Sequence, residues 1–136
     1  MTFVVDASVT LAWCFGDAGS DLAERVLDRL AGEEALAPAI WPLEVAHGLR
    51  TAERRGRLDL AGLAQVRELL TALPVRIEGV SLDAALREVS ELARALELSA
   101  YDAAYLALAA RRGVALATVD QQLRSACERA GVEVAG

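Results

Sequence analysis

The sequence of 136 residues contains no lysine, so all fourteen of its basic residues are arginines, and it contains one histidine. Arginine favours planar, bidentate pairing with phosphate or carboxylate, but the absence of lysine also follows from genome composition alone. Aromatic residues are scarce at 4%, whereas hydrophobic residues make up 54% of the chain. That hydrophobic content excludes a disordered chain and indicates a compact protein with a sizeable core.

Several targeting and cross-linking features are also missing. No stretch approaches the ~18 consecutive apolar residues of a membrane span. The first residues, MTFVVDASVT, lack the basic segment and cleavage site of a signal peptide. Two cysteines, Cys14 and Cys127, are too few for a disulfide framework. We therefore expect one domain over residues 1–136, located in the cytoplasm and without membrane contact.

The net charge of −6 and the pI near 4.8 oppose general binding to phosphate groups. A nucleic acid would have to be bound locally, by a small part of the surface. The two tryptophans and two tyrosines are too scattered to indicate a platform for stacking bases, and we expect them mostly in the core or in dimer contacts.

Short apolar runs alternate with helical patterns along the chain. Strands are predicted at 2–6, 34–38, 74–80, 114–120 and 132–135, and helices at 20–32, 42–56, 59–73, 81–96, 99–113 and 122–130. Strands separated by helices are typical of an α/β fold, in which a parallel sheet has helices on both faces.

Ligands of such folds bind beyond the carboxyl ends of the strands, where this sequence has Asp6 and Asp120. Ion pairing provides a second criterion for selecting acids. Five of the twenty acidic residues have no arginine within four positions: Asp6, Asp17, Glu34, Glu44 and Asp102. Asp17 and Glu34 fall in glycine-containing turns, where solvation is expected. Asp6, Glu44, Asp102 and Asp120 remain as the candidate functional acids.

Each of these four acids also has a purely structural explanation. Ser99 and Asp102 form a capping box, and Glu44 lies in a first helical turn, where the helix dipole favours negative charge. Asp6 and Asp120 fit Asx turns or helix caps. These explanations leave one coincidence open, because all four acids can reach the same edge of the sheet.

Four stretches, in the order VVDASV, PLEVAHGL, YDAAYLALA and LATVD, resemble the motifs of the PIN-domain ribonucleases, especially the VapC-type toxins of toxin–antitoxin pairs. The resemblance covers nearly the whole chain and implies a three-layer α/β/α domain around a short parallel sheet. It also implies a metal-binding and catalytic set consisting of Asp6, Glu44, Asp102 and Asp120, with Ser8 and Thr118 as polar helpers.

Converging carboxylates need a compensating charge. Two of them ~4 Å apart repel by about 4 kcal/mol at an effective dielectric constant near 20. Ligands that are all oxygen favour Mg²⁺ or Mn²⁺, which orient a water, lower its pKa and stabilise charge on a phosphodiester. The expected activity is therefore endoribonuclease hydrolysis of RNA, with 5′-phosphate and 3′-hydroxyl products implied by the resemblance.

The sequence departs from the family pattern at two places. His47 stands one turn beyond Glu44 where many relatives have asparagine, and we expect it to support the site rather than bind the metal. Gln121 and Gln122 follow Asp120 where some relatives have another acid, which leaves the number of metals open.

The sequence also bears on RNA contacts, on alternative functions and on partners. Arg55 falls within about 20° of the helical face of Glu44, where it could bind an RNA phosphate. An arginine at the C-terminal end of a helix also interacts favourably with the helix dipole, which is a purely structural explanation.

A haloacid-dehalogenase phosphatase has a second Asp where this chain has Ser8, and neither common glycine-rich nucleotide motif is present. The alternative is a PIN-like interaction module with weak or no nuclease activity. The resemblance implies a homodimer and a cognate antitoxin.

Overall fold

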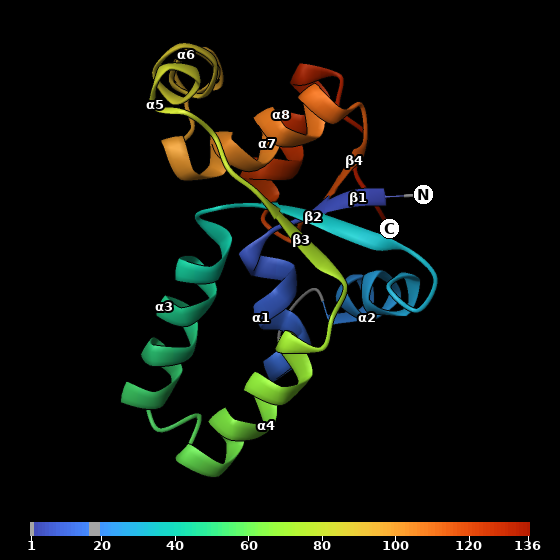
Figure 1. Cartoon of the computed structure of the whole chain (residues 1–136), viewed down its shortest axis with the longest axis vertical. Coiled ribbons are helices and arrows are strands. Elements are labelled where there is room, and N and C mark those ends of the chain that lie inside the picture. The colour runs from blue at the N-terminus through green and yellow to red at the C-terminus, as the bar shows by residue number, and fades with distance from the viewer. Residues whose placement is uncertain (1, 17–19) are drawn as a thin grey trace.

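The computed structural model of the chain describes residues 2–16 and 20–136. At its centre lies a parallel four-stranded sheet with the strand order β3-β2-β1-β4 (Figure 1). Its strands are β1 (Thr2–Val5), β2 (Glu34–Pro38), β3 (Val75–Glu78) and β4 (Ala115–Ala117).

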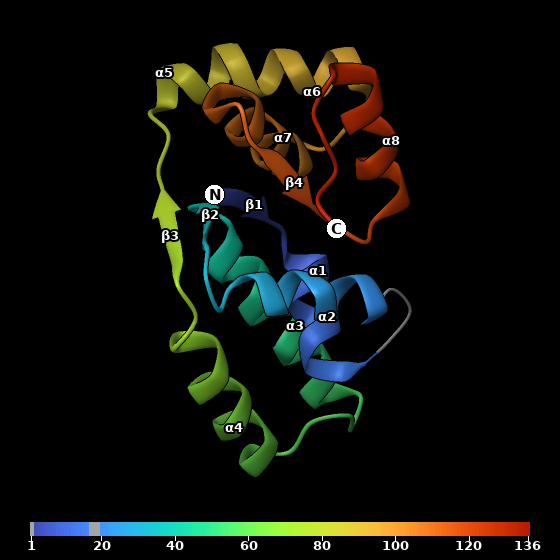
Figure 2. The ribbon, with the colours of Figure 1, turned by 90° about the vertical axis from the view of Figure 1, so that its right-hand side faces the viewer.

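Helices cover both sides of this sheet and form the outer layers. One side carries α1 (Ala7–Phe15), α2 (Ser20–Arg29), α3 (Trp41–Arg54) and α4 (Leu60–Thr71). The other carries α5 (Leu82–Ala84), a π-helical turn (Ala85–Val89), α6 (Ser90–Leu96), α7 (Ala100–Arg112) and α8 (Gln121–Ala130). The two perpendicular views in Figures 1 and 2 both show this division. The predicted three-layer α/β/α architecture is confirmed.

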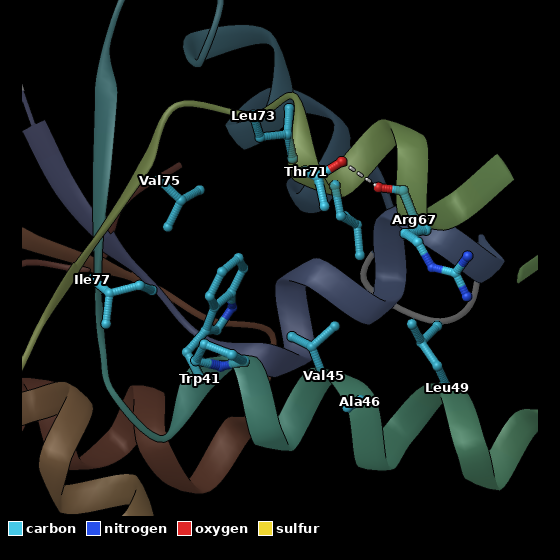
Figure 3. Close-up of a pocket in the computed structure, with 11 residues that line it drawn as sticks. Trp41, Val45, Ala46, Leu49, Arg67, Thr71, Leu73, Val75 and Ile77 are labelled. Atoms are coloured by element: carbon cyan, nitrogen blue, oxygen red, sulfur yellow. Dashed lines mark hydrogen bonds between the residues drawn. The ribbon is translucent and has the colours of Figure 1, made fainter. Parts of the chain in front are cut away.

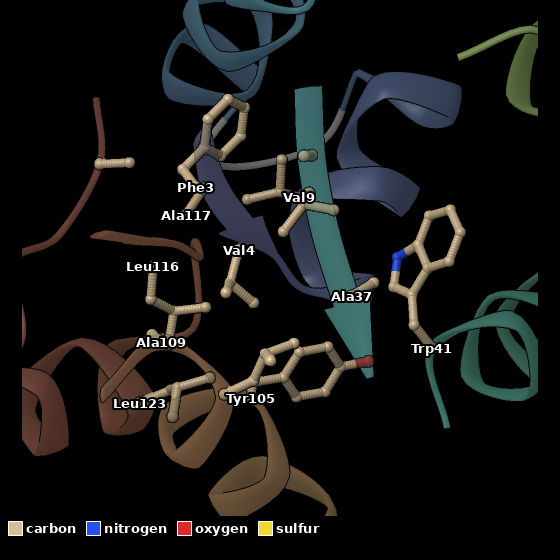
Figure 4. Packing of buried hydrophobic residues seen from close by; sticks show 14 of the residues in the cluster. Phe3, Val4, Val9, Ala37, Trp41, Tyr105, Ala109, Leu116, Ala117 and Leu123 are labelled. Atoms are coloured by element: carbon tan, nitrogen blue, oxygen red, sulfur yellow. The ribbon is translucent and has the colours of Figure 1, made fainter. Parts of the chain in front are cut away.

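The core lies on both faces of β1, the strand between β2 and β4. Phe3, Val4 and Val5 of this strand have no exposed surface, because helices cover both faces of the sheet. Tyr105 and Leu123 pack around the same cluster from α7 and α8 (Figure 4). This tight packing holds the carboxyl ends of β1 and β4 side by side, with Val5 opposite Ala117.

Three expectations from the sequence were wrong. The helix α1 was not predicted, because its apolar residues do not follow one face clearly. The strand expected at 114–120 ends at Ala117, and the strand expected at 132–135 is reduced to one parallel bridge between Leu116 and Val134.

Glu34 and Asp17 were expected in solvated turns. Glu34 is exposed as expected, but it begins β2 rather than lying in a turn, and its carboxylate lies 3.4 Å from the guanidinium of Arg76 on the neighbouring β3. Asp17 lies outside the described residues. Within the described part of the chain, no helix has the length and apolar character needed to cross a membrane.

Candidate functional site

A cavity of about 290 Å³ opens at the carboxyl edge of the sheet. All four candidate acids line it, and each comes from a different part of the chain: Asp6 follows β1, Glu44 lies on α3, Asp102 lies on α7 and Asp120 follows β4. The other lining residues are Ala7, Ser8, Leu11, His47, Gly48 and Tyr105. The structure therefore brings together acids that are up to 114 positions apart in the sequence.

Asp6 is buried, with 4% of its surface exposed, directly after β1. It caps α1, since its Oδ1 accepts hydrogen bonds from the Val9 backbone N–H at 3.0 Å and from the Ser8 hydroxyl at 2.7 Å. Asp6 therefore both caps α1, as predicted, and lines the cavity. The cap fixes the direction of the carboxylate at the end of the strand.

Ser8 and Thr118 connect the two strand ends. Their hydroxyl oxygens lie 3.2 Å apart, and Ser8 also accepts a hydrogen bond from the backbone N–H of Val119. Thr118 is fully buried beneath the cavity, where its hydroxyl accepts from the backbone N–H of Asp120 at 3.0 Å. These contacts set the spacing between Asp6 and Asp120.

Asp120 caps α8 in the same way that Asp6 caps α1. Its Oδ1 accepts a hydrogen bond from the backbone N–H of Leu123 at 3.0 Å. The side chain remains exposed at the mouth of the cavity. Both strand-end acids are therefore held by the first turn of the helix that follows them.

Glu44 lies in the first turn of α3, and its Oε1 accepts a hydrogen bond from the hydroxyl of Tyr105 on α7. Close packing brings α3 to this position. A Cβ atom at Gly48 would clash with the Leu11 side chain on α1, so glycine permits the two helices to approach closely without displacing that side chain.

Asp102 is half-buried in the first turn of α7. The Ser99 hydroxyl accepts a hydrogen bond from the Asp102 backbone N–H at 3.1 Å, which is one half of the predicted capping box. The reciprocal bond is absent, and the Asp102 carboxylate has no hydrogen-bond or ion-pair partner within residues 2–16 and 20–136. Capping therefore does not account for the carboxylate of Asp102, which is one of the residues that line the cavity.

The carboxylates act on one another electrostatically. The pKa of Asp6 is raised from 3.8 to about 6, chiefly by burial and to a smaller extent by the charge of Asp120, against the lowering effect of its hydrogen bonds. Burial, followed by the charges of Asp120 and Glu44, also raises the pKa of Asp102. The cavity thus carries negative charge that no cationic side chain among its lining residues offsets.

The remaining residues selected from the sequence occupy different surroundings. His47 lies exposed at the rim of the cavity, whereas Arg55 lies exposed at the C-cap of α3 and does not line the cavity. Tyr105 was missed as a residue of the site. A signal for it exists in DAAY, since a residue three positions after Asp102 lies on the same helical face.

The four carboxylates match a hard divalent cation in donor type and in charge. In the described part of the chain, however, no three His, Cys, Asp or Glu side chains form a ready-made metal site. The four acids line one cavity, but their carboxylates are not arranged around a single metal position. The donor chemistry fits Mg²⁺ or Mn²⁺, and the spacing requires water or side-chain movement to complete the coordination.

The opposite face of α3 borders a larger, apolar cavity of about 500 Å³. Trp41, Val45 and Leu49 line it from α3, together with residues of α4 and β3 (Figure 3). Arg67 is its one charged lining residue. This helix therefore separates an acidic cavity from an apolar one.

Comparison with known proteins identifies the family. The model of the PIN domain matches residues 3–129. The chain belongs to the PIN-domain family. Ribonuclease VapC3 of Pyrobaculum aerophilum is a relative of this PIN domain, with 36% identity over 127 residues that cover 90% of this chain and 92% of the relative.

Solved structures confirm the fold of this PIN domain. The crystal structure of PAE2754 from Pyrobaculum aerophilum has a TM-score of 0.69 and 25% identity, and the match covers 93% of this chain and 84% of that one. A toxin–antitoxin complex from Klebsiella pneumoniae has a TM-score of 0.60 and 19% identity, with coverages of 87% and 86%. The resemblance seen in the sequence motifs is thereby confirmed.

Proposed function

We propose that this PIN domain is a divalent-metal-dependent endoribonuclease and the toxin of a toxin–antitoxin pair. The relative named Ribonuclease VapC3 supports ribonuclease activity on RNA. The observation that carries the proposal is the cavity at the sheet edge, which four carboxylates line with no arginine among the described lining residues. The negative charge of these carboxylates favours a bound cation, and that cation would in turn bind a phosphate of the RNA.

Asp6, Glu44, Asp102 and Asp120 would hold Mg²⁺ or Mn²⁺. When bound, the cation supplies the Lewis-acid chemistry needed to hydrolyse a phosphodiester. Ser8 orients the Asp6 carboxylate through its hydrogen bond. Burial and neighbouring negative charges raise the pKa of Asp6 and Asp102, and a bound cation would offset the repulsion between the carboxylates.

Two further residues support the site in this proposal. Thr118 sets the position of Asp120 through the backbone N–H of that residue. His47, exposed at the rim, has no hydrogen-bond partner among the described residues and is available to a substrate. We assign it a supporting contact with RNA or water rather than with the metal.

The arginines at the end of α3 are the proposed path for RNA. Arg55 lies eleven residues beyond Glu44, which is about 16 Å along the helix axis. Arg54 and Arg55 are exposed and have no ion-pair partner within the described ranges. Their charges are therefore available to phosphates that lead toward the acidic cavity, although the net charge of the whole chain is −6.

The partner of this toxin would be an antitoxin protein. An arginine or lysine of that partner, placed in the acidic cavity, would replace the metal's charge and block RNA at once. A homodimer is part of the same proposal, and sedimentation of the purified protein measures it. The location proposed is the cytoplasm, which is compatible with Cys14 and Cys127 being free thiols.

Cleavage of an RNA panel tests the activity. The EDTA-treated protein should cut RNA only after Mg²⁺ or Mn²⁺ is added, and Glu44→Gln and Asp120→Asn should remove the cutting. Asp28→Asn, an exposed change of the same charge on α2, is the matched control and should cut as the wild type does. If no RNA is cut in any condition while the cations still bind, the chain is an interaction module and the proposal is wrong.

A further inference from the structure

Tyr105 is almost fully buried, with 1% of its surface exposed, yet it also lines the acidic cavity. Its ring packs in the core, and Figure 4 shows its hydroxyl directed away from Leu116 and Leu123. That hydroxyl donates a hydrogen bond to Oε1 of Glu44, from α7 to α3. The contact spans 61 positions of sequence and links the helix of Asp102 to the helix of Glu44.

Core packing explains the ring of Tyr105 but not its hydroxyl. A phenylalanine would fill the same apolar volume without placing a polar atom beside buried surface. The hydroxyl is a hydrogen-bond donor, and its acceptor is Glu44, one of the four acids of the cavity.

Glu44 needs this support more than the acids at the strand ends. Asp6 and Asp120 are short side chains held by the helices that they cap. Glu44 has one more rotatable bond, and the Tyr105 hydroxyl is its one hydrogen-bond partner among the described residues. Without that hydroxyl, its carboxylate would sample several rotamers at the rim of the cavity.

We propose that Tyr105 is a positioning residue, which restricts the Glu44 carboxylate to a single orientation at the cavity where a divalent cation would bind. This inference rests on the proposed function and deepens it. Hydrogen-bond partners of metal-binding side chains typically change metal affinity about 10–100-fold when they are removed. A purely structural tyrosine would change the stability of the protein and leave metal affinity unchanged.

Metal titration of Tyr105→Phe is the test. Mg²⁺ and Mn²⁺ are titrated into EDTA-treated protein by calorimetry, without RNA, and the melting temperature is recorded with and without metal. We expect roughly 10-fold weaker metal binding or more, together with a metal-free melting temperature close to that of the wild type. In RNA cleavage at fixed metal concentration, kcat should fall while KM for RNA changes little.

Two further variants keep the test specific. Tyr101→Phe removes the hydroxyl of a tyrosine on the same helix that is 59% exposed, and it should bind metal as the wild type does. Glu44→Asp retains the carboxylate but withdraws it from the hydroxyl. Adding Tyr105→Phe to Glu44→Asp should therefore cause no further loss of metal affinity, because the hydroxyl acts only through Glu44.

The outcomes separate this inference from the proposed function. If the wild type binds no divalent cation, both are wrong. If the wild type binds metal and cuts RNA, and Tyr105→Phe binds metal equally well, the nuclease proposal stands and the positioning role is refuted. Equal losses from Tyr105→Phe in the wild-type and Glu44→Asp proteins would also refute it, since the hydroxyl would then act by another route.

Discussion

Replacing Asp6 with asparagine should stabilise the metal-free protein at neutral pH. The folded state raises the pKa of Asp6 from 3.8 to about 6, chiefly because the side chain is buried. The folded protein therefore binds this proton more tightly than the unfolded chain does. An asparagine at this position removes the buried charge, and its Oδ1 can still accept the hydrogen bonds of Ser8 and Val9.

The size of the effect follows from the difference between the two pKa values. Each pH unit of difference corresponds to about 1.4 kcal/mol, so ionised Asp6 lowers the free energy of unfolding by about 3 kcal/mol at pH 7. The stability due to protonated Asp6 is fully present below about pH 4, and it is lost as the pH rises through about 6. In Asp6→Asn this part of the pH dependence should be missing, and the melting temperature at pH 7 should rise by on the order of 10 °C.

Thermal and urea unfolding of EDTA-treated protein between pH 4 and pH 8 measures this difference. Asp28→Asn is the matched control, since it removes one exposed charge from α2 and should keep the wild-type pH profile. Addition of Mg²⁺ should then stabilise the wild type and have little effect on Asp6→Asn, because a ligand stabilises only the state that binds it.

A stability of Asp6→Asn at or below that of the wild type at pH 7 would refute this reasoning. It would mean that the hydrogen bonds from Ser8 and Val9 favour the charged carboxylate by more than burial disfavours it. A parallel pH dependence of the two proteins between pH 4 and pH 6 would lead to the same conclusion.

Three further changes probe the surroundings of the cavity. Asp102→Asn should keep or slightly raise the stability of the metal-free protein, because it relieves repulsion from neighbouring acids, yet it should abolish RNA cleavage. Retained cleavage would contradict the proposed role of Asp102 in binding the metal. Ser99→Ala should cost about 1 kcal/mol in urea unfolding through loss of the α7 cap while cleavage persists, and an unchanged midpoint would show that this cap contributes little. Gly48→Ala should lower the melting temperature and reduce the free energy of unfolding by on the order of 1 kcal/mol, because the new Cβ would displace Leu11. A higher melting temperature would be inconsistent with the close approach of α1 and α3.

Much of the fold could be predicted from local patterns. The apolar runs at residues 2–5 and 34–38 become adjacent parallel strands, and the helical periodicities after them become α3 and α4. The structure differs where periodicity is weak. In α1, apolar residues occur on most sides, because the helix packs against both α2 and α3, so its sequence shows no polar face.

The candidate acids could be selected from the sequence because each one lacks a local ionic partner or ends a strand. Their convergence on one cavity depends on the order of the strands, since β1 and β4 are neighbours in space and distant in sequence. Asp120 shows the limit of selecting acids by local ion pairing. Arg124 lies four positions away in the sequence, but its side chain donates a hydrogen bond to the backbone oxygen of Thr118.

The sequence by itself indicated the family, the α/β class and the four candidate acids, because these depend on residue types at fixed local spacings. Only the tertiary structure decided that a tyrosine of the core supports Glu44, that Gly48 permits α1 and α3 to approach, and that Asp102 lacks a carboxylate partner in the described part of the chain. Such contacts join positions far apart in the sequence. They arise from the packing of helices on both faces of the sheet, which no local pattern encodes.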